Sequence, residues 1–298
     1  MMERALAWRL GLSTILIPGL FGLFVADHRA GESAPLLFVF CLVLAVRSAW
    51  ELQQLLTVRQ MRPQLAAPAI GCIALLAAAW WPHLADRPLP ETSLGLIGLT
   101  FTCCFVALLG LAAAQYREPG RTMETLGANL IILGYCGLLL AVTAQLRWQA
   151  GAQAGYLLLG SLIITAKLGD VGAYTVGRLF GKRKMSPLLS PGKTWAGFVG
   201  ALLGSALASW AWLTFATPRF GNGWTPPPAS ASLVYGLVIG VVALAGDLCE
   251  SLIKRDVGKK DSAPLFPGFG GLLDLLDSVL YAGPVAVILW HILPLRTW

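Results

Sequence analysis

The feature that most constrains this chain is a series of apolar runs, each long enough to cross a lipid bilayer. Polar segments separate nine such runs, at roughly residues 10–26, 34–50, 65–82, 94–114, 126–146, 154–177, 195–215, 232–252 and 272–293. A spanning helix needs about 17–25 mainly apolar residues, and lipid requires the backbone to satisfy its own polar groups. The sequence therefore predicts an all-α, polytopic integral membrane protein with about nine transmembrane helices. The second run is short and the sixth carries charge, so eight or ten spans remain alternatives.

Composition agrees with a membrane protein and excludes two other classes. The chain is 56% hydrophobic and 12% charged, whereas soluble domains carry about 25% charged residues. Its net charge of +7 would suit nucleic acid, but no basic stripe or nucleic-acid motif accompanies it, so we expect no nucleic-acid partner. The six cysteines have no C-x-x-C spacing, and we expect neither a disulfide framework nor a cysteine metal site.

The distribution of basic residues predicts the orientation. If the N-terminus is cytoplasmic, most lysines and arginines fall on the cytoplasmic side of the nine spans. The opposite side then holds one arginine in each segment, namely Arg29, Arg87, Arg147, Arg219 and Arg296. Cytoplasmic loops are enriched in lysine and arginine. We therefore expect a multi-pass protein of the cell membrane with a cytoplasmic N-terminus.

The two halves of the chain differ in the polar residues they carry. Residues 1–150 contain apolar runs with short loops and no cluster of chemically useful side chains, so we expect N-terminal helices that act as scaffold and contact lipid. Residues 151–298 contain three polar clusters beside apolar runs, all on the predicted cytoplasmic side. We expect the functional site in this half.

The first cluster begins inside the sixth apolar run. Lys167 and Asp170 are three residues apart, so they share a helix face, and charged groups within a membrane usually face a cavity or each other. Arg178, Lys182 and Lys193 follow among glycines, which suits a polyphosphate or an anionic lipid head group. Two alternatives remain open. Lys167 and Asp170 could pair only with each other, and the basic residues could form an ordinary loop in contact with lipid head groups.

The second cluster ends the eighth run. Asp247, Ser251 and Lys254 have helical i, i+4 and i+7 spacing, which places them on one face. A carboxylate, a hydroxyl and an ammonium group on that face suit a metal ion together with phosphate oxygens. The alternative is a helix end where lysine reaches the membrane surface and Asp247 pairs locally.

The third cluster is a glycine-rich turn that leads into Asp274 and Asp277, three residues apart at the head of the last run. Magnesium takes few protein carboxylates and completes its shell with phosphates and water. Two aligned aspartates with a third nearby are what a two-cation phosphoryl-transfer site requires. Aspartates that complement the helix dipole are the alternative.

The segment from Ser251 to Asp277 resembles the C-terminal motif of the phosphatidate cytidylyltransferases, whose pattern runs S-x-x-K-R, K-D, P-x-H-G-G and D-R-x-D. The matching residues here are Ser251, Lys254, Arg255, Lys260, Asp261, Pro267, Gly270, Gly271, Asp274 and Asp277. Upstream, Gly246-Asp247 with Glu250-Ser251 is similar to the family's G-D-x-x-E-S. The resemblance covers roughly residues 165–280. Phe269 stands where the family has histidine, and Leu275 where it has arginine.

The resemblance implies a Mg²⁺-dependent enzyme that transfers a cytidylyl group from CTP to phosphatidate of the inner leaflet. It implies that Asp247, Asp274 and Asp277 hold Mg²⁺, with room for a second cation, and that Ser251 and Lys254 act with them in catalysis. The implied substrate-binding residues are Asp170, Arg178, Lys182, Lys193, Arg255, Lys260 and Asp261. Membrane lipids are the expected partners, and the resemblance allows a homodimer.

The two departures leave alternatives open. No histidine can replace the one lost at Phe269, because His28, His83 and His291 all fall on the predicted outer side. A phosphomonoester, with a second pKa near 6, is already largely anionic and needs no strong base. Slow or altered catalysis, another lipid phosphate as acceptor, and a non-catalytic relative therefore remain alternatives. A transporter is disfavoured because no inverted repeat is visible.

Overall fold

The computed structural model describes residues 2–58, 63–84, 93–151, 153–266 and 270–298, with side chains described from residue 11 onward. Within these residues, nine helical segments are long and apolar enough to cross a membrane. The predictions of an all-α fold and a multi-pass membrane protein are confirmed. Phe269, where the sequence departs from the family motif, lies outside the described residues.

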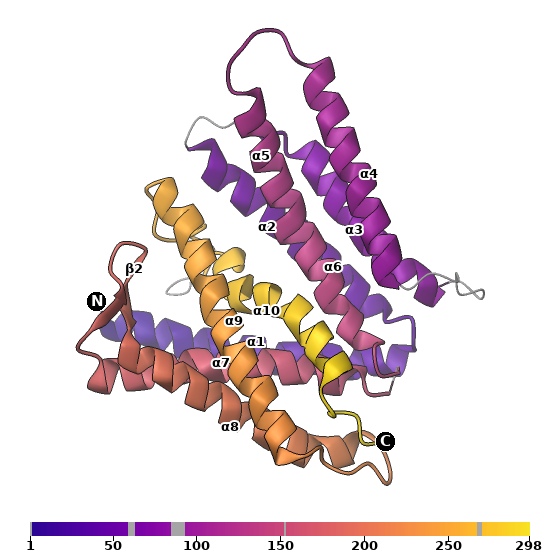
Figure 1. The fold of residues 1–298 in the computed structure, drawn as a ribbon, viewed down its shortest axis with the longest axis vertical. Coiled ribbons are helices and arrows are strands. Elements are labelled where there is room, and N and C mark those ends of the chain that lie inside the picture. The colour runs from indigo at the N-terminus through magenta and orange to yellow at the C-terminus, as the bar shows by residue number, and fades with distance from the viewer. Residues whose placement is uncertain (1, 59–62, 85–92, 152, 267–269) are drawn as a thin grey trace. The chain divides into compact units, whose positions relative to one another are not determined.

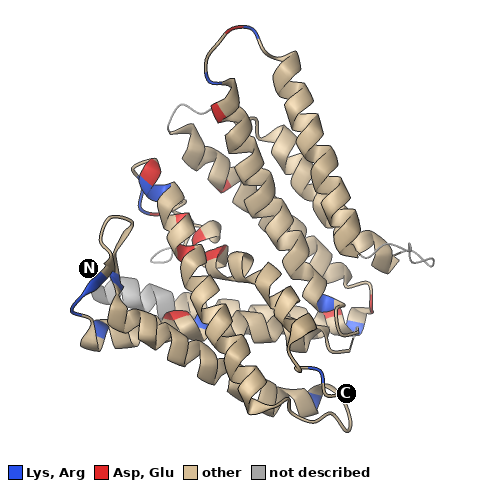
Figure 2. Cartoon of the chain, in the orientation of Figure 1, with Lys and Arg blue, Asp and Glu red and all other residues tan. Residues whose placement is uncertain are grey.

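The nine spans follow the predicted apolar runs. They are the part Gly11–Ala30 of α1 (Met2–Ala30), then α2 (Pro35–Thr57), α3 (Ala66–Leu84), α4 (Ser93–Ala114), a composite span Thr122–Arg147, α7 (Gly155–Phe180), α8 (Trp195–Phe220), α9 (Ala229–Asp256) and α10 (Leu272–Ile292). The composite span joins α5 (Thr122–Ile132), a π-helical stretch (Leu133–Leu138), α6 (Leu139–Ala144) and a short 3₁₀ turn (Gln145–Arg147). In Figure 2 the helices are mainly tan, as helices that face lipid require.

A small β-hairpin interrupts the helical pattern between α7 and α8. Strands β1 (Lys184–Ser186) and β2 (Ser190–Thr194) pair antiparallel, where the sequence predicted only a basic loop. Thr194 ends β2 and begins α8, because its Oγ1 accepts a hydrogen bond from the backbone N–H of Gly197 at 3.0 Å. This side-chain cap satisfies one of the free N–H groups at the start of the helix. The hairpin thereby fixes Lys193 two residues before Trp195, the first residue of α8.

The chain forms two compact units. The first comprises residues 1–142 and 257–275, and the second comprises residues 143–256 and 276–298. The core of the first unit is apolar: Leu52, Leu75, Trp80 and Ile132 are fully buried. The indole of Trp80 donates to the carbonyl oxygen of Ala34 at 3.2 Å, so this large side chain also anchors the start of α2.

The second unit depends on close contacts between small residues. Helices α7 and α8 lie side by side, and α9 packs against them (Figure 1). A Cβ atom added at Gly200 would overlap the carbonyl oxygen of Gly172, so the two backbones approach closely, as is common for membrane helices. A buried network also joins three helices, because Ser161 of α7 contacts the Tyr235 hydroxyl at 3.0 Å and accepts from the Trp290 indole at 3.2 Å.

Candidate active site

Three carboxylates gather in the second unit where α9 meets α10. Asp247 and Glu250 lie one helical turn apart on α9, and Asp277 lies on α10. One oxygen atom from each residue lies within 4.8 Å of the others. Glu250 is 1% exposed and Asp277 6% exposed. Like charges held this close in a buried place repel one another unless cations compensate them.

A glycine brings the two helices together at this point. A Cβ atom added at Gly246 would lie 2.5 Å from Cβ of Tyr281 and 2.9 Å from the carbonyl oxygen of Asp277. Both distances are shorter than ordinary van der Waals contacts. The glycine that precedes Asp247 therefore allows the close approach of α9 to α10, and this approach places Asp247 near Asp277.

Lysines pair with two of the three carboxylates. Lys193 of β2 lies 2.8 Å from Oδ2 of Asp247, and Lys254 lies 2.6 Å from Oε2 of Glu250. The Ser251 hydroxyl donates to Oδ1 of Asp247 at 3.4 Å. Asp247 and Ser251 thus share the helix face that their spacing predicted, whereas the ammonium group of Lys254 pairs with Glu250. Buried charges are tolerated when they are paired in this way.

A second polar group links α7 with α10. Lys167 lies 3.4 Å from Oδ2 of Asp170 and donates to the Ser278 hydroxyl at 2.9 Å. The same hydroxyl lies 3.4 Å from Oδ2 of Asp170, and the backbone N–H of Ser278 contacts Oδ1 of Asp277 at 2.5 Å. Lys167 and Asp170 therefore form a pair, as one alternative in the sequence analysis had it, but the pair also contacts Ser278. Ser278 connects it with the neighbouring residue Asp277.

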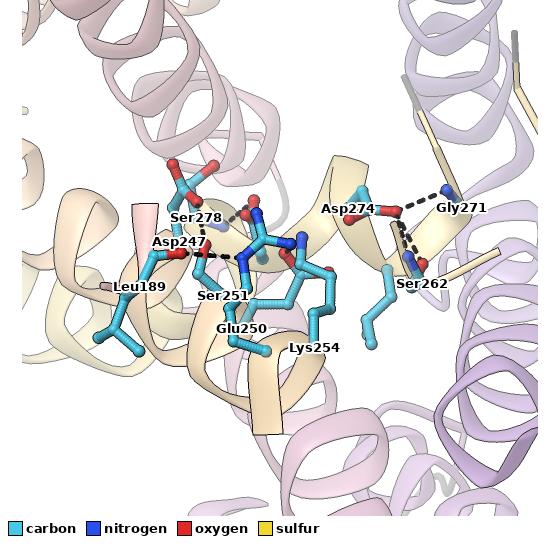
Figure 3. Close-up of polar contacts among 12 residues, drawn as sticks. Leu189, Asp247, Glu250, Ser251, Lys254, Ser262, Gly271, Asp274 and Ser278 are labelled. Carbon is cyan, nitrogen blue, oxygen red and sulfur yellow. Dashed lines mark hydrogen bonds and ion pairs between the residues drawn. The ribbon is translucent and has the colours of Figure 1, made fainter. Parts of the chain in front are cut away.

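Asp274 has different partners, which lie in the first unit. Its Oδ2 accepts hydrogen bonds from Gly271 N–H at 2.7 Å, from Ser262 N–H at 2.9 Å and from the Ser262 hydroxyl at 2.8 Å (Figure 3). Asp247 and Asp277, two of the three expected metal ligands, thus fall in one cluster. The third carboxylate of that cluster is Glu250, which the sequence analysis did not select. The sequence did contain an indication of this role, because Glu250 follows Asp247 by three residues within the G-D-x-x-E-S pattern.

The other expected binding residues lie nearer the surface. Arg178 is exposed and donates to the Tyr174 hydroxyl at 2.8 Å, and Arg255 donates through Nε to the Leu189 carbonyl at 3.1 Å. Lys182, Lys260 and Asp261 are exposed. Through Leu189, Arg255 connects the end of α9 with the turn of the β-hairpin, so the basic hairpin is attached to the helix that carries Asp247 and Glu250.

The donor set suits a hard divalent cation. Mg²⁺ binds carboxylate oxygens at about 2.0–2.1 Å in octahedral geometry, so opposite ligands lie about 4.2 Å apart. Among three ligands of one octahedron at most one pair is opposite, and the other pairs lie about 2.9 Å apart. Oxygens within 4.8 Å of one another would therefore close in by up to about 2 Å, which rotation of the side chains provides. Asp247, Glu250 and Asp277 could therefore hold Mg²⁺.

Comparisons with known proteins cover most of the chain. The model of the cytidylyltransferase family matches residues 7–293. A phosphatidate cytidylyltransferase of Haemophilus influenzae is 31% identical over 261 residues, covering 74% of this chain and 88% of the relative. The one of Pseudomonas aeruginosa is 31% identical over 245 residues, covering 81% and 83%.

Mycobacterial relatives match over a shorter part. A phosphatidate cytidylyltransferase of Mycobacterium leprae is 43% identical over 134 residues, which is 45% of this chain and 39% of the relative. That of Mycobacterium bovis is 36% identical over 178 residues, or 60% and 54%. The chain therefore spans about half the length, or less, of these mycobacterial proteins.

Proposed function

We propose that this chain, which belongs to the cytidylyltransferase family, transfers a cytidylyl group from CTP to phosphatidate, giving CDP-diacylglycerol and pyrophosphate for phospholipid biosynthesis. The observation that carries the proposal is the cluster of Asp247, Glu250 and Asp277, flanked by paired lysines. The name phosphatidate cytidylyltransferase, shared by the relatives compared above, supports phosphatidate as the acceptor.

The reaction is a displacement at phosphorus. An oxygen of the phosphatidate phosphate attacks the α-phosphorus of CTP, a new P–O bond forms, and the bond to the bridging oxygen breaks so that pyrophosphate leaves. The attacking phosphomonoester is largely anionic at neutral pH, so a strong base is not required. Catalysis then depends on positioning the two phosphates and on compensating their charge.

In this mechanism the carboxylates bind the cation and the lysines bind phosphate oxygens. Asp247, Asp277 and Glu250 would hold Mg²⁺, which when bound compensates phosphate charge; Asp274 remains a proposed ligand from the motif. Ser251 and Lys254 would contact phosphate oxygens beside the reacting centre. Substrate phosphates would also be bound by basic residues of α7, of the hairpin region and of the end of α9: Arg178, Lys182, Lys193 and Arg255. Asp170, Lys260 and Asp261 remain proposed substrate-binding residues to which no particular substrate group is assigned.

The proposal also gives the location of the protein and the roles of the two parts of the chain. The N-terminus and the site would face the cytoplasm, where CTP is available, and the protein would reside in the cell membrane with access to phosphatidate of the inner leaflet. Residues 151–298 would form the catalytic region, and residues 1–150 would provide helices that contact lipid. The excess of lysine and arginine on one predicted side of the membrane supports this orientation.

The test is the formation of CDP-diacylglycerol from CTP by purified protein in phosphatidate-containing micelles, with and without Mg²⁺. Asp277→Asn keeps the shape of the side chain and removes its charge, so we expect turnover to fall by about 10²-fold or more. Asp261→Asn, an exposed residue of the same motif, is the comparison for a milder loss. A wild-type protein that forms no product with saturating Mg²⁺ would contradict the proposal.

A further inference from the structure

A buried glutamate of α2 contacts the beginning of α10 in the first unit. Glu51 is 0% exposed. Its Oε1 accepts a hydrogen bond from Leu272 N–H at 3.0 Å and lies 3.0 Å from Arg47. Its Oε2 accepts from Leu273 N–H at 3.0 Å and from the Ser262 hydroxyl at 3.1 Å. The carboxylate thus has four polar contacts from three separate segments of the chain.

These contacts are those of a helix cap. The first N–H groups of a helix have no partner within the helix, and the side chain of the preceding residue usually accepts from them. Here the preceding residue is Gly271, which has no side chain. A Cβ atom at Gly271 would overlap both Glu51 and the Ser262 hydroxyl, so the space that a local capping side chain would occupy is filled by Glu51.

Asp274 adds a second contact to the cap of α10, at the N–H group of Gly271. It lies three residues after Gly271 and accepts from the N–H of that residue at 2.7 Å (Figure 3), which is the contact that the third helical residue makes in a capping box. The Ser262 hydroxyl lies 2.8 Å from Asp274 and 3.1 Å from Glu51. One serine therefore connects the distant cap with the aspartate of the motif.

We propose that Glu51 is a positioning residue for Asp274: it caps α10 in place of a side chain at residue 271 and, through Ser262, fixes the carboxylate that the proposed function assigns to catalysis. The catalytic consequence rests on the proposed function, whereas the capping role does not. A residue in the half of the chain that the sequence marked as scaffold would thus control the geometry of the motif.

Charge explains why glutamate suits this place. The start of a helix carries partial positive charge, so a carboxylate is stabilised there. The two oxygens of glutamate accept from both Leu272 and Leu273, whereas glutamine has one acceptor oxygen and would turn an NH₂ group toward one of these N–H donors. Glu51→Gln therefore keeps the volume of the side chain and loses half of the cap.

The first measurement is amide hydrogen exchange of the segment that contains Leu272 and Leu273, in purified full-length protein. Hydrogen bonds to charged groups are among the stronger ones, and we expect exchange at these amides to be about tenfold faster in Glu51→Gln. The turnover number and the Mg²⁺ concentration for half-maximal rate are measured on the same samples. We expect a lower turnover number and a higher Mg²⁺ requirement, since a purely structural loss would lower the active fraction and leave the Mg²⁺ requirement unchanged.

A rescue experiment keeps the proposal testable if the single variants fold poorly. Glu51→Ala removes the distant cap, and Gly271→Ser places a local capping hydroxyl where Glu51 now lies. Each change alone should raise amide exchange and lower turnover. Together they should restore slow exchange at Leu272 and Leu273, because Glu51 no longer occupies the space of the new side chain and the remaining close neighbour, the Ser262 hydroxyl, can rotate away.

The outcomes separate this inference from the proposed function. Unchanged amide exchange in Glu51→Gln, or a double variant no better than the worse single one, overturns the capping role. Altered exchange with wild-type turnover and an unchanged Mg²⁺ requirement overturns the positioning role. If the wild type lacks CTP turnover altogether, the proposed function fails, while the exchange data still decide whether Glu51 caps α10.

Discussion

Gly246 lies where α9 packs closely against α10, and Gly246→Ala perturbs the carboxylate cluster without removing any of its members. The added Cβ atom would lie 2.5 Å from Cβ of Tyr281 and 2.9 Å from the carbonyl oxygen of Asp277. Carbon atoms prefer separations of about 3.5–4.0 Å, so the helices must separate by on the order of 1 Å. Asp247 is the next residue on α9, and it moves with the helix.

The expected effect on activity is large for so small a change. Oxygens that now lie within 4.8 Å of one another would spread by a similar distance, away from the separations of about 2.9–4.2 Å that one octahedral Mg²⁺ requires. A misplacement of about 1 Å can cost about 10²-fold in rate. Overpacking typically destabilises a protein by about 1–3 kcal/mol, which lowers the midpoint of thermal unfolding without abolishing folding of a helical bundle of this size.

The assay is CTP turnover at a series of Mg²⁺ concentrations, together with thermal unfolding in detergent. Gly110→Ala is the matched control, because a Cβ atom added to this residue of α4 would have no atom within 4 Å. We expect wild-type kinetics from Gly110→Ala, and a reduced turnover number with a raised Mg²⁺ requirement from Gly246→Ala. Wild-type kinetics in Gly246→Ala would refute the reasoning that this glycine sets the geometry of the cluster.

Three further predictions concern the second unit. Lys193→Gln, which removes the charge paired with Asp247 at 2.8 Å, should raise the KM for CTP about tenfold in initial-rate assays, and a KM equal to that of the wild type would contradict a phosphate-binding role. Gly200→Leu should separate α7 from α8, because its Cβ would overlap the carbonyl oxygen of Gly172. We expect this variant to elute as aggregated protein in size-exclusion chromatography, and a monodisperse variant would count against this packing. A chelator should abolish CDP-diacylglycerol formation and excess Mg²⁺ should restore it, whereas turnover that survives chelation would remove the metal from the proposed mechanism.

The sequence predicted the membrane-spanning fold well because that signal is local. An apolar run of sufficient length needs no knowledge of its neighbours to be identified as a spanning helix, and even the sixth run, which carries Lys167 and Asp170, is a continuous helix, α7. The spacing of Asp247 and Ser251 similarly predicted a shared face, which the structure shows. The extent of a helix and the residues that share one of its faces could therefore be predicted from the sequence alone.

Contacts between distant segments were not readable in this way. Glu51 and Leu273 are 222 residues apart along the chain, and no local pattern marks a glutamate of an apolar helix as the cap of another helix. Asp274 and Asp277 have the same i, i+3 spacing as other same-face pairs, yet Asp274 accepts from its own N-terminal turn while Asp277 joins the carboxylates of α9. Spacing predicts which side chains share a face, and tertiary contacts decide what each of them binds.

The charges of the second unit indicate how CTP and Mg²⁺ would depend on each other. Asp247 and Glu250 are paired with Lys193 and Lys254, so these lysines are not available to phosphate while they compensate carboxylates. A cation bound by the same carboxylates would neutralise their charge in place of the lysines. The ammonium groups of the lysines could then bind phosphate oxygens. Conversely, a polyphosphate that approached without a cation would be repelled by the carboxylates while the lysines attract it. Because such coupling is reciprocal, the proposed function requires each ligand to raise the affinity for the other.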